Sequence, residues 1–164
     1  MILQSPLLQI HHTALCVNDF DRAKAFYVDF LGFTLEGEMD HRGEPALGEV
    51  VGLPGAVIRW ALLAHGSHRL ELFKYYSPQG ETQARRQCDF GYSHMGFIVD
   101  DVDAVYQQVI AAGYAVISPP RTLRGGRTKV FYVQEPENAV TEFMQVFDTA
   151  PDISDSPQQP SEAS

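Results

Sequence analysis

The sequence predicts an α+β fold made of two similar halves, because one series of signals occurs twice. Residues 10–27 read IHHTALCVNDFDRAKAFY, and residues 91–109 read GYSHMGFIVDDVDAVYQQV. Each contains a histidine, alternating apolar residues, closely spaced aspartates and an amphipathic run, in that order. Stretches with the two-residue alternation of half-buried strands follow in both halves. We therefore expect each half to hold a strand, a helix and then two or three strands.

In the first half, HTALCV (12–17) alternates as a strand does. Asp19 or Asp21 can cap the next helix, because a short carboxylate accepts hydrogen bonds from the free N–H groups of a first turn. Gly32 ends this helix. Its apolar face comprises Phe20, Ala23, Tyr27 and Phe30. The later strand candidates are AVIRWALLA (56–64) and HRLELFKYY (68–76).

The second half repeats this order. HMGFIV is the strand, Asp101 or Asp103 is the cap, and Gly113 ends the helix. The apolar face of the helix comprises Val102, Val105, Tyr106 and Val109. The later strand candidates are TKVFYV (128–133) and VTEFMQVF (140–147).

The amino-acid composition indicates how the chain is organised and which functions are excluded. Of the 164 residues 45% are apolar, which is enough for one domain, and we place it at 9–147 with halves at about 9–78 and 91–147. Residues 148–164 are rich in Pro, Ser, Asp and Gln, so we expect a disordered acidic tail. The net charge of −9 argues against nucleic-acid binding. The N-terminus lacks a basic start and a long apolar run, so we expect a cytoplasmic protein without a membrane span.

Four side chains at matched positions of the two halves suggest a metal site. His12 and His94 are equivalent in the repeat, and Glu71 and Glu142 are carboxylates flanked by apolar residues in predicted strands. A half-buried carboxylate needs a compensating partner. Two imidazoles and two carboxylates suit one divalent ion such as Zn²⁺, Ni²⁺, Co²⁺, Mn²⁺ or Fe²⁺. Any one of the four would be an ordinary residue by itself, so the symmetry of the set carries the prediction.

The other chemically active side chains receive no function. Cys16 and Cys88 form no metal or redox pair, and Cys16 occupies an apolar strand position where we expect a buried, inert thiol. Strand alternation would point His11 away from the face of His12. The remaining histidines do not recur in the second half and are His41, His65 and His68.

The combined motifs resemble those of the vicinal oxygen chelate superfamily, which includes glyoxalase I, epimerases, extradiol dioxygenases and bleomycin resistance proteins. They are HTALCV-x-DFDRAKAFY-x-x-FLGF, RLELFKY, YSHMGFIVDDVDA and VQEPENAVTEFMQ. The resemblance implies two tandem βαβββ modules that form a cleft around one metal. It also implies that the ligands are His12, Glu71, His94 and Glu142, a set similar to that of bacterial-type glyoxalase I.

Substrate-binding candidates lie in three places. The basic segment 119–130 contains Arg124 and Arg127, which could hold an anionic group on the substrate. Arg59 and Trp60 point to opposite faces of a strand, so one of them should line the cavity. The Gly- and Pro-rich loop 41–56 carries two further carboxylates as candidate bases, Glu44 and Glu49.

The resemblance implies a metal-dependent lyase or isomerase that stabilises an enediolate or enolate. Glu142 is the preferred base and Glu71 the second candidate. An extradiol-type dioxygenase is one alternative, although a fourth protein ligand would fill a position that O₂ chemistry needs. A small-molecule binding or resistance protein without turnover is the other. We expect a homodimer that binds a small, anionic molecule and neither nucleic acid nor membranes.

Overall fold

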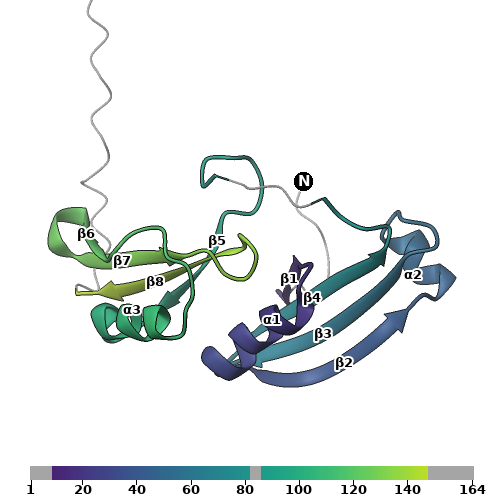
Figure 1. The fold of residues 1–164 in the computed structure, drawn as a ribbon, viewed down its shortest axis with the longest axis horizontal. Coiled ribbons are helices and arrows are strands. Elements are labelled where there is room, and N and C mark those ends of the chain that lie inside the picture. The colour runs from purple at the N-terminus through teal and green to yellow at the C-terminus, as the bar shows by residue number, and fades with distance from the viewer. Residues whose placement is uncertain (1–8, 82–85, 148–164) are drawn as a thin grey trace, which may run out of the picture. The chain divides into compact units, whose positions relative to one another are not determined.

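The computed structural model describes residues 9–81 and 86–147 and contains two four-stranded sheets with flanking helices (Figure 1). The expected tail at 148–164 lies outside the described residues. The first half contains β1 (Thr13–Cys16), α1 (Phe20–Ala25), a π-helical turn (Phe26–Phe30), β2 (Thr34–Arg42), α2 (Pro45–Val50), β3 (Val57–His65) and β4 (His68–Ser77). The second contains β5 (His94–Ile98), α3 (Val102–Ala111), β6 (Arg121–Leu123), a 3₁₀ turn (Arg124–Gly126), β7 (Thr128–Val133) and β8 (Val140–Val146).

The two sheets have the same topology, which confirms the α+β class and the repeat. Their strand orders are β1-β4-β3-β2 and β5-β8-β7-β6. In each sheet the first and last strands pair in parallel, and the other pairs are antiparallel. The register is also repeated, because Ala14 pairs with Glu71 and Gly96 pairs with Glu142.

The chain divides into two compact units. One runs to Gly91 and also includes Glu135–Ala139, and the other comprises 92–134 and the residues from Val140 onward. The Glu135–Ala139 turn joins β7 to β8 along the chain, yet its contacts are with α1. Arg22 Nη2 lies 2.5 Å from Oε1 of the buried Glu135, and Glu137 accepts a hydrogen bond from the backbone N–H of Asp19 at 2.6 Å.

The predicted helix boundaries are confirmed in both units. Asp19 caps α1 by accepting from the N–H of Arg22 at 3.1 Å, and Asp101 caps α3 by accepting from two N–H groups at 3.0 Å. Gly32 and Gly113 follow the helices with φ of 78° and 79°, a left-handed conformation that glycine adopts without strain. Across the described residues, no helix combines the length and the apolar character needed to cross a membrane.

Each sheet buries one face against a helix. In the first unit α1 contacts β4, and the apolar side chains of this layer include Leu15, Phe20, Leu63, Leu70 and Leu72, all buried. In the second unit α3 contacts β7 and β8, where Tyr106 packs edge-on against Phe131 and Phe131 stacks on Phe143. The opposite face of each sheet is not covered by these helices.

Residues 34–56 contain more regular structure than the sequence predicted. β2 extends to Arg42, and α2 occupies the middle of the expected loop. Pro45 begins α2, where its missing N–H costs no hydrogen bond. Within α2, a Cβ at Gly48 would lie 2.8 Å from the carbonyl oxygen of Leu53, so only glycine fits there. The short β6 lies in the predicted basic segment.

Candidate metal centre

His12 and Glu71 meet in the first unit. Glu71 lies in the middle of β4, and His12 immediately precedes the parallel neighbour β1. Their Nε2 and Oε2 atoms are 3.1 Å apart. The Glu71 side chain is 15% exposed, so the carboxylate is largely removed from water and needs a cationic or hydrogen-bonding partner.

His94 and Glu142 form the equivalent pair in the second unit. Their Nε2 and Oε2 atoms are 3.3 Å apart, and the Glu142 side chain is also 15% exposed. The repeat thus creates the same local arrangement twice: a histidine at the start of the first strand faces a glutamate on the strand beside it.

Within each pair, the separation of the two side chains is compatible with two ligands of one divalent cation. Two ligands that are each about 2.1 Å from one metal, with an angle of about 90 to 109° between them, lie about 3.0 to 3.4 Å apart. Both observed separations fall in this interval. Within the described part of the chain, no three His, Cys, Asp or Glu side chains cluster closely enough to hold a metal by themselves. Each unit therefore offers two of the four predicted ligands.

Tyr132 is a neighbour of this centre that the sequence did not reveal. It pairs with Glu142 across β7 and β8, and its hydroxyl donates a hydrogen bond to Oε1 of Glu142 at 3.0 Å. Burial and this hydrogen bond both raise the pKa of the Tyr132 hydroxyl above 10.0. The phenol therefore keeps its proton and remains a donor near neutral pH. Tyr132 lies beside Glu142 because of the register between β7 and β8, which could not be predicted from the sequence.

Gly96 provides room for the Glu142 carboxylate. These residues are partners in the β5–β8 pairing, and a Cβ at Gly96 would lie 3.2 Å from Oε2 of Glu142. The glycine at this position leaves the oxygen that faces His94 unobstructed. The equivalent residue of the first unit is Ala14, so the requirement is specific to the second unit.

The structure assigns Arg59 and Trp60 to faces. Leu62 pairs with Glu71, and Trp60 lies two residues from Leu62 on β3, so Trp60 shares the face of Glu71. Arg59 points to the helix-covered face. Of the two residues predicted to contact the substrate, Trp60 is therefore the one that lies on the face of Glu71.

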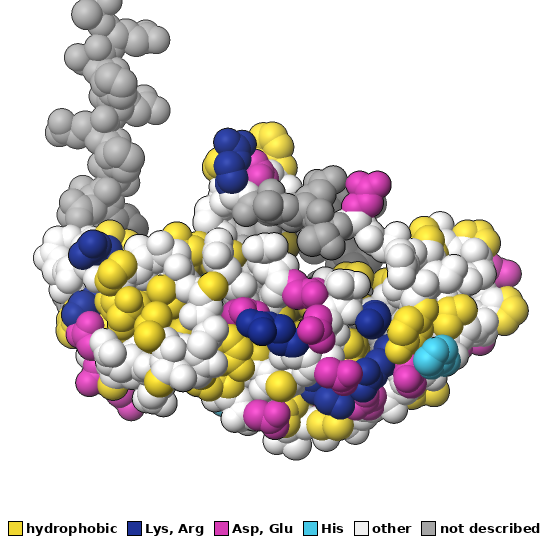
Figure 2. Space-filling view, viewed as in Figure 1, with side chains coloured by type: hydrophobic (Ala, Val, Ile, Leu, Met, Phe, Trp, Pro, Cys, Tyr) yellow, Lys and Arg dark blue, Asp and Glu magenta, His cyan; other side chains and the backbone are white. Residues whose placement is uncertain are grey.

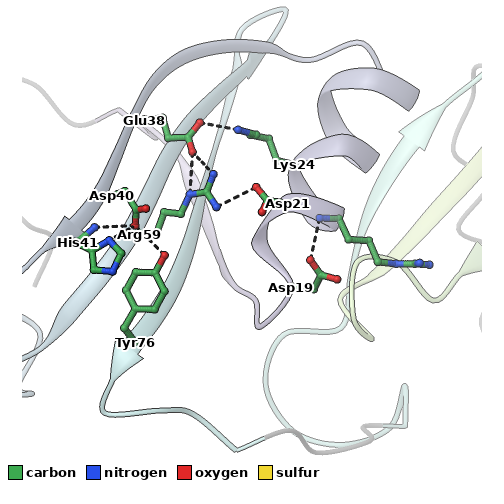
Figure 3. A network of polar contacts seen from close by, with 9 residues as sticks. Asp19, Asp21, Lys24, Glu38, Asp40, His41, Arg59 and Tyr76 are labelled. Carbon is green, nitrogen blue, oxygen red and sulfur yellow. Dashed lines mark hydrogen bonds and ion pairs between the residues drawn. The ribbon is translucent and has the colours of Figure 1, made fainter.

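A charged network occupies the helix-covered side of the first sheet (Figure 3). Arg59 forms ion pairs with Asp21 at 3.0 Å and Glu38 at 2.6 Å, and its guanidinium lies 4.3 Å from the centre of the Phe20 ring. Lys24 also contacts Glu38, at 2.7 Å. Figure 2 shows acidic and basic side chains interspersed in this area. Arg59 thus has a structural role on this side of the sheet.

The basic segment contains one arginine on the face of Glu142. Arg121 pairs with Val130, which pairs with Met144, two residues from Glu142. Arg124 is exposed in the following turn, and Arg127 is half-buried at its end. Lys129 points to the other face and pairs with Asp103 of α3 at 2.5 Å.

The remaining candidates have other environments. Glu44 pairs with Arg42, whose hydrogen bond lowers the pKa of the carboxyl, and Glu49 is exposed on α2. The expectation that Cys16 is buried is wrong, because Cys16 is exposed. It lies two residues from Ala14, the partner of Glu71, so it shares the open face of the sheet. Partial desolvation and the nearby Glu137 raise the pKa of its thiol, which reduces its reactivity.

This chain is thus a two-module protein in which each module presents one His–Glu pair. A family model described as the Glyoxalase/Bleomycin resistance protein/Dioxygenase superfamily matches residues 9–143. The chain belongs to this superfamily.

Similar proteins include enzymes of more than one type. A 2-epi-5-epi-valiolone epimerase of an Actinomyces species is 32% identical over 121 residues, which cover 71% of this chain and 66% of the epimerase, slightly under two thirds. The uncharacterized protein YwkD of Bacillus subtilis is 32% identical over 130 residues, 77% of this chain and 89% of YwkD. A lactoylglutathione lyase of Haemophilus influenzae is 24% identical over 147 residues, 84% of this chain and 93% of the lyase.

A solved structure has the same fold. The glyoxalase family protein of Bacillus cereus superposes with a TM-score of 0.78 at 19% identity, over 90% of this chain and all of that chain. At this identity the comparison supports the fold alone.

Proposed function

We propose that this chain is a divalent-metal-dependent lyase or isomerase of the glyoxalase or epimerase type. The observation that carries the proposal is the recurrence of one His–Glu pair at equivalent positions of both units, with N–O separations of 3.1 and 3.3 Å. Similarity to an epimerase and to a lactoylglutathione lyase supports the reaction class.

In this proposal His12, Glu71, His94 and Glu142 hold one ion, as the repeat predicts. The donor set of two imidazoles and two carboxylates suits Zn²⁺, Ni²⁺, Co²⁺, Mn²⁺ or Fe²⁺. The cation would supply Lewis acidity toward two neighbouring oxygens of the substrate and so acidify the adjacent C–H bond.

Glu142 is the proposed base. Oε1 accepts a hydrogen bond from Tyr132 while Oε2 faces His94, so the orientation of the carboxylate is controlled at both oxygens. To act as the base, Glu142 would have to leave the metal, so that one of its oxygens can accept a proton from the substrate. Glu71 is the second candidate, because it has an equivalent position beside His12.

Substrate recognition is assigned to the two faces that carry the glutamates. Trp60 offers an aromatic surface on the face of Glu71, and Arg121 lies on the face of Glu142. Arg124 and Arg127 follow Arg121 in the same basic segment, so an anionic group on the substrate is favoured. We also propose that the protein is a cytoplasmic homodimer that acts on a small molecule.

Metal analysis with a substrate panel tests the function. The panel comprises 2-oxoaldehyde thiol adducts, 2-methyl-branched acyl thioesters, sugar-like ketones and catechols, each assayed with the metal-free and metal-loaded protein. Metal-dependent proton exchange or product formation on one of the first three classes supports the proposal. Oxygen uptake on catechols by the iron form would establish a dioxygenase instead. Absence of both metal binding and turnover would indicate a binding protein.

A further inference from the structure

Each proposed ligand histidine also contacts the residue before it. Nδ1 of His12 lies 2.8 Å from Nδ1 of His11, and Nδ1 of His94 lies 2.9 Å from Oγ of Ser93. The two contacts are equivalent in the repeat, since each involves the side chain that immediately precedes the histidine. In both units the other ring nitrogen, Nε2, is the one that faces the glutamate.

The chemistry of imidazole indicates which partner donates the hydrogen bond in these contacts. A neutral histidine that binds a metal through Nε2 must carry its proton on Nδ1, and that N–H needs an acceptor. The hydroxyl oxygen of Ser93 is such an acceptor. Nδ1 of His11 is another when the proton of His11 resides on its own Nε2.

We propose that His11 and Ser93 are positioning residues that hold His12 and His94 in the Nδ1–H tautomer, with Nε2 free to bind the metal. This inference rests on the proposed metal site. Two chemically different side chains perform the same function at the same position of the repeat. Neither residue belongs to the predicted ligand set.

The local backbone explains why the sequence predicted another role for His11. Strand alternation would point neighbouring side chains to opposite faces, but β1 begins only at Thr13. Residues 11 and 12 precede the strand, so both rings can approach each other. Their centroids are 5.1 Å apart, and their planes are nearly perpendicular at 88°.

The test compares Zn²⁺ affinities by competition with a chelator. Because loss of an outer partner of a metal ligand weakens binding about 10- to 100-fold, we expect His11→Ala and Ser93→Ala to weaken Zn²⁺ binding about tenfold each. His11→Asn replaces the acceptor nitrogen with an amide oxygen, and Ser93→Thr retains the acceptor hydroxyl, so both variants should recover most of the affinity. The controls His41→Ala and Ser118→Ala remove an exposed histidine and a half-buried serine away from the proposed ligands and should leave affinity within about twofold of the unmodified protein.

Nitrogen-15 NMR of the zinc-loaded protein provides a second readout. The Nδ1–H signals of His12 and His94 should exchange with solvent faster in the alanine variants and be slowed again in the conservative ones. Affinities and exchange rates equal to those of the controls would overturn the inference. The proposed metal site itself fails if the unmodified protein does not bind Zn²⁺, or if His12→Ala and His94→Ala bind it normally.

Discussion

Tyr132 donates a hydrogen bond to one oxygen of Glu142 at 3.0 Å, and Leu62 occupies the equivalent position beside Glu71. Both residues are the antiparallel strand partners of their glutamates. The repeat therefore duplicates the His–Glu pair but supplies a hydroxyl donor in the second unit only. This asymmetry distinguishes two carboxylates whose strand positions and exposures are otherwise matched.

Replacing Tyr132 with Phe should weaken metal binding without disturbing the fold. The variant loses the hydrogen bond that orients Glu142 and keeps the ring that packs at 5.3 Å from His94. We expect Zn²⁺ affinity to fall about tenfold, as for other outer partners of metal ligands. Tyr106→Phe is the matched control, because Tyr106 lies on α3 and packs against Phe131 on the helix-covered face. Equal affinities of both variants would show that the hydroxyl does not support the site.

Replacing Gly96 with Ala should displace the Glu142 carboxylate. The added Cβ would lie 3.2 Å from Oε2 of Glu142, closer than ordinary van der Waals contact. The Glu142 side chain would therefore have to shift. We expect weaker Zn²⁺ binding by at least several-fold and a small change in melting temperature. Ala14→Gly is the comparison variant, because it removes a Cβ at the equivalent residue of the first unit instead of adding one. Unchanged affinity in Gly96→Ala would mean that Glu142 retains its position or is not a ligand.

Local signals predicted the parts of the structure that depend on neighbouring residues. The caps at Asp19 and Asp101 and the turns at Gly32 and Gly113 follow from side-chain chemistry within a few positions. Asn138 has a φ of 70°, in the left-handed region that asparagine tolerates. The internal repeat extended these local signals to the His–Glu pairs.

Contacts between residues that are distant in sequence and not matched in the repeat were not predicted. Tyr132 reaches Glu142 through strand register, and Arg22 reaches Glu135 from 113 positions away. The face of Arg59 was undetermined because alternation separates two faces without identifying which one a helix covers. Arg59 proved to face α1, where Asp21 and Glu38 compensate its charge.

The stability contributed by Glu38 should depend on pH. Burial alone would raise the pKa of this carboxyl, but hydrogen bonds from Lys24 and Arg59 outweigh burial and lower it below 4.5. A carboxyl with a depressed folded-state pKa stabilises the fold above its unfolded-state pKa, and this contribution is lost as pH falls through the folded-state value. Glu38→Gln should therefore lower the free energy of unfolding by about 2 kcal/mol at pH 7 and progressively less below about pH 4.

Urea denaturation of Glu38→Gln and the unmodified protein between pH 3 and 7 measures this difference. Glu36→Gln is the control, because Glu36 pairs with Arg69 on the same sheet but is more exposed, and an exposed ion pair contributes little to stability. A Glu38→Gln effect that is constant over the whole pH range would contradict the assignment of an ionised carboxylate to this network.

Replacing each glutamate of the site with glutamine should separate ligand from base. Glutamine keeps a neutral oxygen that can still bind a metal, but it cannot accept a proton at neutral pH. We expect Glu142→Gln to retain metal with moderately lower affinity and to lose at least about 100-fold in turnover, since general-base catalysis contributes about 10² to 10⁴. Glu71→Gln should lose mainly metal affinity.

Solvent deuterium exchange at the acidic carbon of the substrate, measured together with metal content, distinguishes these effects. If Glu142→Gln keeps both its metal and near-normal exchange, the proton acceptor is another residue. Loss of exchange in Glu71→Gln at full metal occupancy would then move the base to the first unit. The base would in that case be the glutamate without the tyrosine partner, and the hydrogen bond from Tyr132 would serve to keep Glu142 in place as a ligand. Comparing the two variants at equal occupancy therefore assigns one role to each carboxylate.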